Sequence, residues 1–177
     1  MTPSVLLHFS EDPAIEVFEP HVAATAAEDE PLVWAVEDAR QPMFWFPRDC
    51  PRATFWRGPR TSEDDAARLL LGSWRVHAIE WGWLQRMQQV ELFAYRFDPA
   101  PFERHGEGAG YWVARSAVRP LDVAPVGDLL ARHAAAGIEL RLVANLWPLW
   151  DQVVASTLQF SGSRLRNARP RPEGVRG

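Results

Sequence analysis

Short apolar runs, each closed by a proline, a glycine or a polar turn, are the feature that most limits what this chain can fold into. The first run, residues 5–9, reads VLLHF and is followed by the turn sequence SEDP. Five residues are too few for a helix, and this composition favours a strand. The same reasoning predicts strands at residues 32–36, 53–56, 74–80, 90–97, 111–114, 118–123 and 138–143.

Helix signals lie between these runs, and they are also short. A hydroxyl cap followed by acidic residues at 61–64 predicts a helix that ends at Gly72. Asp38 is the predicted N-cap of another helix. Further helices are expected at residues 81–89, 127–136 and 145–158. Strands and helices are mixed irregularly, without the regular βαβ rhythm of a parallel sheet. The pattern therefore predicts an α+β fold.

The chain has no internal repeat and no interior linker, so its 177 residues predict one domain, over residues 1–163. Residues 164–177 are basic, rich in proline and glycine, and nearly free of apolar side chains. Such a segment cannot bury enough apolar surface to order itself. We therefore expect it to be a flexible basic tail.

Composition excludes several classes of protein. The net charge of −4 gives no electrostatic reason to expect a nucleic-acid partner. No apolar run approaches the ~20 residues that span a bilayer, so no membrane partner is expected. The single cysteine, Cys50, excludes an internal disulfide and a cysteine-based zinc cage. The first residues lack the features of a signal peptide, and we expect a cytoplasmic protein.

Motifs with a known mechanism are missing from the sequence. It contains no phosphate-cradling Gly-x-x-x-x-Gly-Lys, no His-Glu-x-x-His and no Gly-x-Ser-x-Gly. We therefore predict no metal site and no resident cofactor from motifs. Any catalytic or binding site must therefore be built from single side chains that are far apart in the sequence and that the fold brings together.

His8 is the first such side chain. Strand alternation places it on one face with Leu6 and Ser10, opposite Leu7 and Phe9. A neutral imidazole can donate one hydrogen bond and accept another, which suits a sugar hydroxyl. The same position also suits a core histidine that bonds to the backbone, and the sequence leaves both interpretations open.

Two further candidates lie in loops. Cys50 stands between Arg48 and Arg52, and nearby cations can activate a thiolate. No histidine in that loop can serve as its base, so simple packing is the alternative. Glu107 lies in a glycine-rich loop at residues 102–110. A carboxylate at a pocket rim can act as an acid or stabilise positive charge, but it can equally be a solvated loop charge.

The longest motifs resemble an uncharacterised bacterial family. They are LLHFSEDP at the amino terminus, PLVWAVED followed by MFWFPRDCPR, and NLWPLWD near the carboxyl terminus. The resemblance covers nearly the whole chain and implies no activity.

A second resemblance is to the ADP-ribosyltransferase fold, in which two small mixed or antiparallel sheets form a cleft flanked by short helices. In that fold an early strand ends in a histidine followed by a small polar residue, here His8 and Ser10. The segments LVWAV, VELFAYRFDPAPF and GYWVARSAVRPLDV are similar to its later strands. The resemblance implies NAD as substrate, with His8 on the ribose and Trp34 or Tyr111 stacked on nicotinamide.

The chain departs from that fold family at one position. Many members have a glutamate directly before the last active-site strand, whereas Gly110 stands there in this chain and Glu107 is the nearest preceding carboxylate. Two hypotheses follow. The protein is an ADP-ribosyltransferase-like enzyme that uses Glu107 or another acid, or it is a non-catalytic module of the same fold that binds a small ligand or a protein segment.

Overall fold

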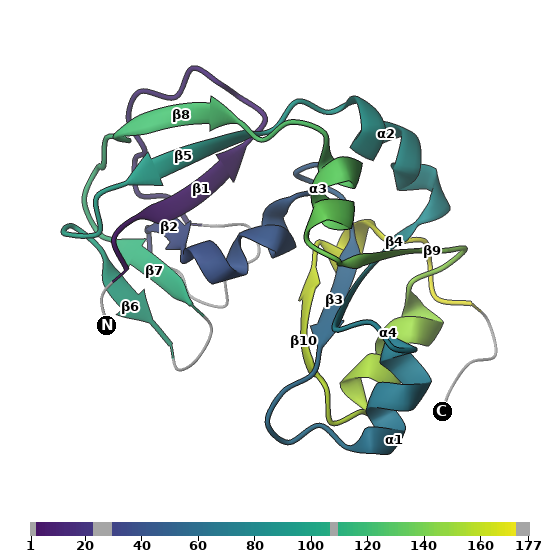
Figure 1. Cartoon of the computed structure of the whole chain (residues 1–177). Helices are drawn as coiled ribbons and strands as arrows, with labels where there is room; N and C mark the ends of the chain where they lie inside the picture. Colours follow the sequence, from purple (N-terminus) through teal and green to yellow (C-terminus); the bar gives the residue numbers. More distant parts are fainter. Residues whose placement is uncertain (1–2, 23–29, 107–109, 173–177) are drawn as a thin grey trace. The chain divides into compact units, whose positions relative to one another are not determined.

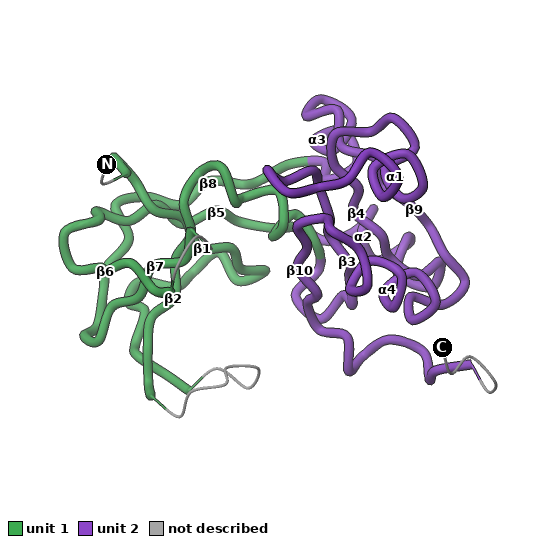
Figure 2. The backbone as a smooth tube through the Cα atoms, turned by 90° about the horizontal axis from the view of Figure 1, so that it is seen from below, with its two compact units in different colours: residues 1–46, 91–127 green, residues 47–90, 128–177 purple. Residues whose placement is uncertain are grey.

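The computed structural model describes residues 3–22, 30–106 and 110–172 (Figure 1). The chain forms two compact units, and each unit is assembled from two separate stretches of sequence (Figure 2). Unit 1 comprises residues 1–46 and 91–127, and unit 2 comprises residues 47–90 and 128–177.

Unit 1 is built on a six-stranded sheet in the order β6-β7-β2-β1-β5-β8. Every neighbouring pair in it is antiparallel. The 3₁₀ helix η1, Asp38–Phe44, follows the second strand, and its N-cap is Glu37 rather than the expected Asp38. The strands are β1 Leu6–Ser10, β2 Val33–Val36, β5 Phe93–Phe97, β6 Glu103–His105, β7 Tyr111–Ala114 and β8 Asp122–Pro125.

One face of this sheet carries the core of unit 1. Its largest fully buried side chain, Tyr95, contacts the ring of Phe18 at a centroid distance of 5.0 Å. The Tyr95 hydroxyl donates to the Asp12 carbonyl at 2.6 Å and accepts from the Ile15 N–H at 3.1 Å. These two bonds fasten the segment after β1 over the core. The other core residues are Leu6, Phe18, Val33, Ala35, Phe97, Phe102, Trp112, Ala114 and Val118.

Unit 2 is built on a four-stranded sheet in the order β10-β3-β4-β9. The β4–β9 pair is parallel and the other pairs are antiparallel. The strands are β3 Arg52–Trp56, β4 Arg75–Glu80, β9 Glu139–Val143 and β10 Gln159–Ser163. The helical segments are α1 Glu63–Asp65, η2 Ala66–Leu70, η3 Trp81–Trp83, α2 Leu84–Gln89, α3 Leu129–Ala135, α4 Trp147–Val154 and η4 Leu165–Asn167.

The α+β fold class is confirmed, with one antiparallel and one mixed sheet flanked by short helices. Among the described residues, no helix combines the length and apolar character needed to cross a bilayer. The short strands β6 and β10 have no counterpart among the strands that the sequence predicts. The single domain expected over residues 1–163 stays a prediction.

The described part of residues 164–177 makes hydrogen bonds to other segments of unit 2, and the expectation of a flexible basic tail stays a prediction. Glu80, which is 3% exposed, accepts from the Arg169 N–H at 3.1 and 3.2 Å. The Asn145 side chain donates to the Pro170 carbonyl, and Trp147 Nε1 donates to the Arg169 carbonyl, both at 2.8 Å. Hydrogen bonds to Glu80, Asn145 and Trp147 therefore hold this part of the segment, together with Leu165 and Ala168, which pack against the core of unit 2.

Two buried histidines join β4 to α3 in unit 2. His133 Nδ1 lies 2.7 Å from the Leu129 carbonyl, and His133 Nε2 lies 3.0 Å from His77 Nδ1. A carbonyl can only accept, so Nδ1 of His133 carries a proton. Burial lowers the pKa of both rings, which favours the neutral pair, in which His133 Nε2 accepts from His77 Nδ1.

We predict that acid weakens unit 2 through this pair. Burial lowers the pKa of His77 well below its usual 6.5 and, with Arg75 nearby, lowers the pKa of His133. The unfolded chain then binds more protons, so the stabilisation is complete above about pH 6.5 and is lost as the pH falls. Melting temperatures measured between about pH 7.5 and about pH 5.5 should fall, while carboxylates stay ionised.

His133→Gln is the informative variant for this prediction. Whatever its stability at neutral pH, its melting temperature should depend less steeply on pH than that of the natural chain. A natural chain whose melting temperature is unchanged or higher at the acidic end contradicts the neutral pair.

Candidate functional site

The pairing of β1 with β2 in unit 1 is incomplete. β1 is matched to β5 at all five of its residues, but it is matched to β2 only at Leu7 and Val36. The next positions in that register, Phe9 and Trp34, do not form a ladder pair. The sheet is therefore open between its two central strands on one side of Leu7.

The backbone of Phe9 faces this opening. Alternate residues of an antiparallel strand direct their N–H and C=O groups to alternate neighbours. The Val126 N–H donates to the Leu92 carbonyl, so the backbone N–H and C=O groups of even-numbered residues along β5 face β8. The backbone groups of its odd-numbered residues therefore face β1. His8, opposite Tyr95, therefore uses its backbone groups on β5. Those of Phe9 point toward β2.

The His8 side chain spans the opening. Its Nδ1 lies 2.8 Å from the Trp34 carbonyl, which can only accept, so Nδ1 carries the proton. In the neutral ring Nε2 then has the lone pair and can accept a hydrogen bond. The ring is half-buried and lies edge-on to Phe18, with centroids 4.9 Å apart. His8 therefore fulfils the backbone-bonded interpretation through Nδ1.

The structure places the predicted ligand residues of unit 1 on two faces of the sheet. The registers put His8 on the core face with Ala35 and Tyr95, as alternation predicts. Ser10 shares that face and is buried, and its hydroxyl accepts from the Asp12 N–H at 3.1 Å.

The two aromatic candidates lie together on the opposite face. Trp34 and Tyr111 have ring centroids 6.2 Å apart, and Phe44 of η1 joins them at 6.3 Å from Tyr111. Phe9 stacks on Phe44 at 6.0 Å. Trp34 Nε1 is buried and has no hydrogen-bond partner among the described residues. These aromatic side chains and His8 lie on opposite faces of the sheet and share no pocket wall. Only the backbone of β1 and β2 lies between them.

Glu37 is a candidate that sequence reasoning missed. Its N–H donates to the Gly110 carbonyl at 3.1 Å, which extends the β2–β7 pairing by one step. Its Oε1 accepts from Trp112 Nε1 at 2.9 Å. A Cβ added at Gly110 would lie 3.5 Å from Glu37 Oε2. The carboxylate of Glu37 therefore lies beside the position directly before β7, on the same face as His8.

Glu107, the acid proposed from sequence, lies outside the described residues. The signal that could have found Glu37 is its register against Gly110, because both residues sit at the ends of strands that the sequence predicts. That register depends on which strands are neighbours, and a single sequence does not give strand order.

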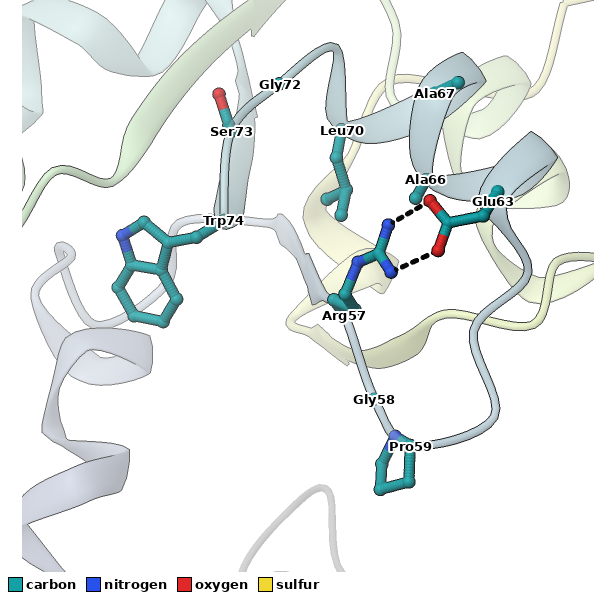
Figure 3. A pocket seen from close by; sticks show the side chains of 10 residues that line it. All are labelled: Arg57, Gly58, Pro59, Glu63, Ala66, Ala67, Leu70, Gly72, Ser73 and Trp74. Atoms are coloured by element: carbon teal, nitrogen blue, oxygen red, sulfur yellow. Dashed lines mark hydrogen bonds and ion pairs between the residues drawn. The ribbon is translucent and has the colours of Figure 1, made fainter.

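Unit 2 contains a pocket of about 710 Å³ that none of the predicted site residues lines (Figure 3). It lies between the end of β3, the π-helical turn η2 and the start of β4. Arg57 and Glu63 form a two-bond ion pair on one side, and Trp74 stands on another. Ala66 and Leu70 contribute buried apolar surface.

Cys50 does not fit the interpretation as an activated thiolate. The side chain is buried, and this burial raises its pKa from 9.0 to about 12 despite the opposing charge of Arg52. The thiol therefore stays protonated and unreactive at neutral pH. In the described ranges 3–22, 30–106 and 110–172, no three histidine, cysteine or acidic side chains are grouped to hold a metal ion.

Comparison with known proteins gives a family but no activity. The model of DUF6886, a family of unknown function, matches residues 7–168. The chain belongs to DUF6886. This match agrees with the expected membership of an uncharacterised family. No curated protein and no solved structure matches this DUF6886 chain.

We predict that Cys50 is silent toward thiol reagents in the folded protein. A rise in its pKa from 9.0 to about 12 cuts the thiolate fraction at pH 8 by roughly three powers of ten. Titration with a chromogenic disulfide should detect almost no thiol in native buffer and one per chain in guanidinium chloride. Rapid reaction of the native chain contradicts the burial of Cys50.

Proposed function

We propose that this DUF6886 protein is ADP-ribosyltransferase-like: it binds NAD or a related nucleotide at the opening between β1 and β2 and transfers the ADP-ribosyl group. The observation that carries the proposal is the bond from His8 Nδ1 to the Trp34 carbonyl at 2.8 Å. It fixes the tautomer in which Nε2 carries the lone pair, and we assign a ribose hydroxyl to this atom, at a place where the sheet is not closed by its own backbone.

The arrangement of the strands supports the proposal. The segments that resemble the ADP-ribosyltransferase fold include β1, β2, β5 and β7, and these are consecutive neighbours in the order β7-β2-β1-β5. They are separate in sequence, and the insertion of residues 47–90 divides them. A fold-level likeness alone does not establish function, so the proposal also requires a chemically suitable site.

Two parts of an NAD molecule find suitable groups at the opening. The Phe9 N–H and C=O point toward it and can pair with a planar carboxamide, which carries one acceptor and two donors. The rings of Trp34, Phe44 and Tyr111 lie on the opposite face of the sheet, so we assign none of them to an NAD molecule that contacts His8. His8 Nε2 serves the ribose hydroxyl, and Ser10 stabilises the turn that follows through the Asp12 N–H.

The transfer step requires an anion near the ribosyl carbon. The bond from ribose C1′ to the nicotinamide nitrogen breaks, and both electrons leave with nicotinamide. A nucleophilic oxygen of the acceptor, water in the simplest case, bonds to C1′ and releases its proton. We assign the stabilisation of the positive charge at C1′ to Glu37, because its carboxylate lies beside Gly110 on the face that carries His8. Glu107 is the alternative acid.

A non-catalytic binding module is the second candidate function. The observation that favours it is the separation of Trp34 and Tyr111 from His8 by the sheet itself. An aromatic surface with a buried indole donor, Trp34 Nε1, can bind a small ligand or protein segment without any reaction. In either case we propose a cytoplasmic protein with no nucleic-acid partner.

We predict that the chain binds NAD and that His8 contributes to the affinity. Ligand at about 100 times its dissociation constant should add roughly 2.7 kcal/mol to the free energy of unfolding. His8→Ala removes one hydrogen bond to ribose and should weaken binding about tenfold by calorimetry. The control is His21→Ala, because His21 is exposed and its ring lies against the nearby Glu19 carbonyl, while its backbone bonds to Leu32 are unaffected by the change.

Two results bear against NAD as ligand. One is the absence of both binding and nicotinamide release at millimolar NAD. The other is a His8→Ala variant that binds NAD as tightly as the His21→Ala control does.

We further predict that Glu37→Gln separates binding from chemistry. Glutamine still accepts from Trp112 Nε1 but carries no charge, so NAD affinity should stay within a few-fold while nicotinamide release slows about 100-fold. Asp38→Asn is the matched control, because it changes a neighbouring acid that lies in η1. If Glu37→Gln leaves the rate unchanged and Glu107→Gln abolishes it, the assignment of the acid to Glu37 is wrong.

A further inference from the structure

We propose that unit 2 holds a separate site for a small molecule that joins a flat aromatic ring to a carboxylate. The site is the pocket of about 710 Å³ between the end of β3, η2 and the start of β4 (Figure 3). That volume lies within the range of small-molecule pockets. The inference is independent of the NAD proposal, because every residue that lines the pocket belongs to unit 2.

The carboxylate half of the ligand is assigned to Arg57. The guanidinium of Arg57 already binds the carboxylate of Glu63 through two parallel bonds of 2.7 and 2.8 Å. Glu63 therefore demonstrates that this fork accepts a planar carboxylate in the pocket wall. The pair is exposed on both sides, at 49% and 84%. Exposed ion pairs contribute little to stability, so a ligand carboxylate can displace Glu63 at little cost.

The aromatic half is assigned to Trp74. This indole is 54% exposed, which is unusual for so large an apolar ring. Its orientation is nonetheless fixed, because Nε1 donates to the Ala136 carbonyl at 3.2 Å. Figure 3 shows Trp74 and the Arg57–Glu63 pair on different sides of the pocket, with Leu70 and Ala66 beside the pair. A ring that stacks on Trp74 can thus direct an attached carboxylate toward Arg57.

The charge around the pocket favours an anion. The Arg75 guanidinium lies 5.8 Å from the centre of the Trp74 ring and 4.4 Å from that of Trp56. Arg57 and Glu63 cancel one another, so displacing Glu63 into solvent leaves the pocket with net positive charge. A ligand carboxylate restores the balance.

The backbone at the pocket rim is shaped at some energetic cost. The chain passes from the π-helical turn η2 into Leu71, whose φ is +51°, and then into Gly72, whose φ is +92°. A left-handed conformation is strained for leucine, and such residues gather at ligand sites. π-Helical turns are also frequent at functional sites. The two features together place Ser73 and Trp74 at the pocket.

The test is a titration of the full chain with 2-naphthoate, with 2-naphthamide as the uncharged match, followed by NMR or calorimetry. We expect naphthoate to bind at least about tenfold more tightly than the amide. Arg57→Gln and Trp74→Ala should each weaken naphthoate binding about tenfold. Glu63→Gln should strengthen it several-fold, because the internal competitor loses its charge.

Matched variants keep the test decisive. Arg60→Gln and Trp81→Ala change an exposed arginine and an exposed tryptophan that do not line the pocket, and both should bind as the natural chain does. Trp74→Phe keeps a ring if Trp74→Ala unfolds, and it should retain most of the affinity. No binding at millimolar naphthoate overturns the proposal, and so does binding that Arg57→Gln leaves unchanged or Glu63→Gln weakens.

Discussion

The hydrogen bond from the His8 imidazole to the Trp34 carbonyl replaces a backbone pair between the two central strands of unit 1. A continuous ladder would have used the N–H of Phe9 for the same carbonyl. The His8 side chain donates to the Trp34 carbonyl, while β1 and β2 are left without a backbone pair at this position. The same bond fixes the tautomer of His8, with the proton on Nδ1. The proposed site depends on this substitution, since it sets both the opening and the acceptor at Nε2.

Local patterns in the sequence predicted the helices and strands better than they predicted which strands pair with one another. The strand around His8, its alternation and the α+β class follow from runs of a few residues, and Ser62 caps its helix as the hydroxyl–acid pattern indicates. The edge strands β6 and β10 were not predicted, because Glu103–His105 and Gln159–Ser163 have few apolar side chains and gain order only from their neighbours. Glu37 was missed for the same reason: its role depends on a register against Gly110.

Burial decides the chemistry of the polar groups of unit 2 that the sequence leaves open. The sequence allows Cys50 to be a reactive thiol or a packed one, and burial outweighs the charge of Arg52, so its pKa rises to about 12. His77 and His133 bond to one another, and Glu80 binds backbone N–H groups of Leu146 and Arg169. These side chains are therefore structural. The exposed groups, Trp74 and Arg57, remain available for a ligand, although no sequence motif marks them.

The most direct test of the account is ¹⁵N NMR of the imidazole nitrogens of His8, in the chain without ligand and with ADP-ribose. The account predicts a neutral ring protonated at Nδ1, with an Nε2 signal that moves toward a hydrogen-bonded acceptor when ADP-ribose is added. A ring protonated at Nε2, or an Nε2 signal that saturating ADP-ribose does not change, contradicts it.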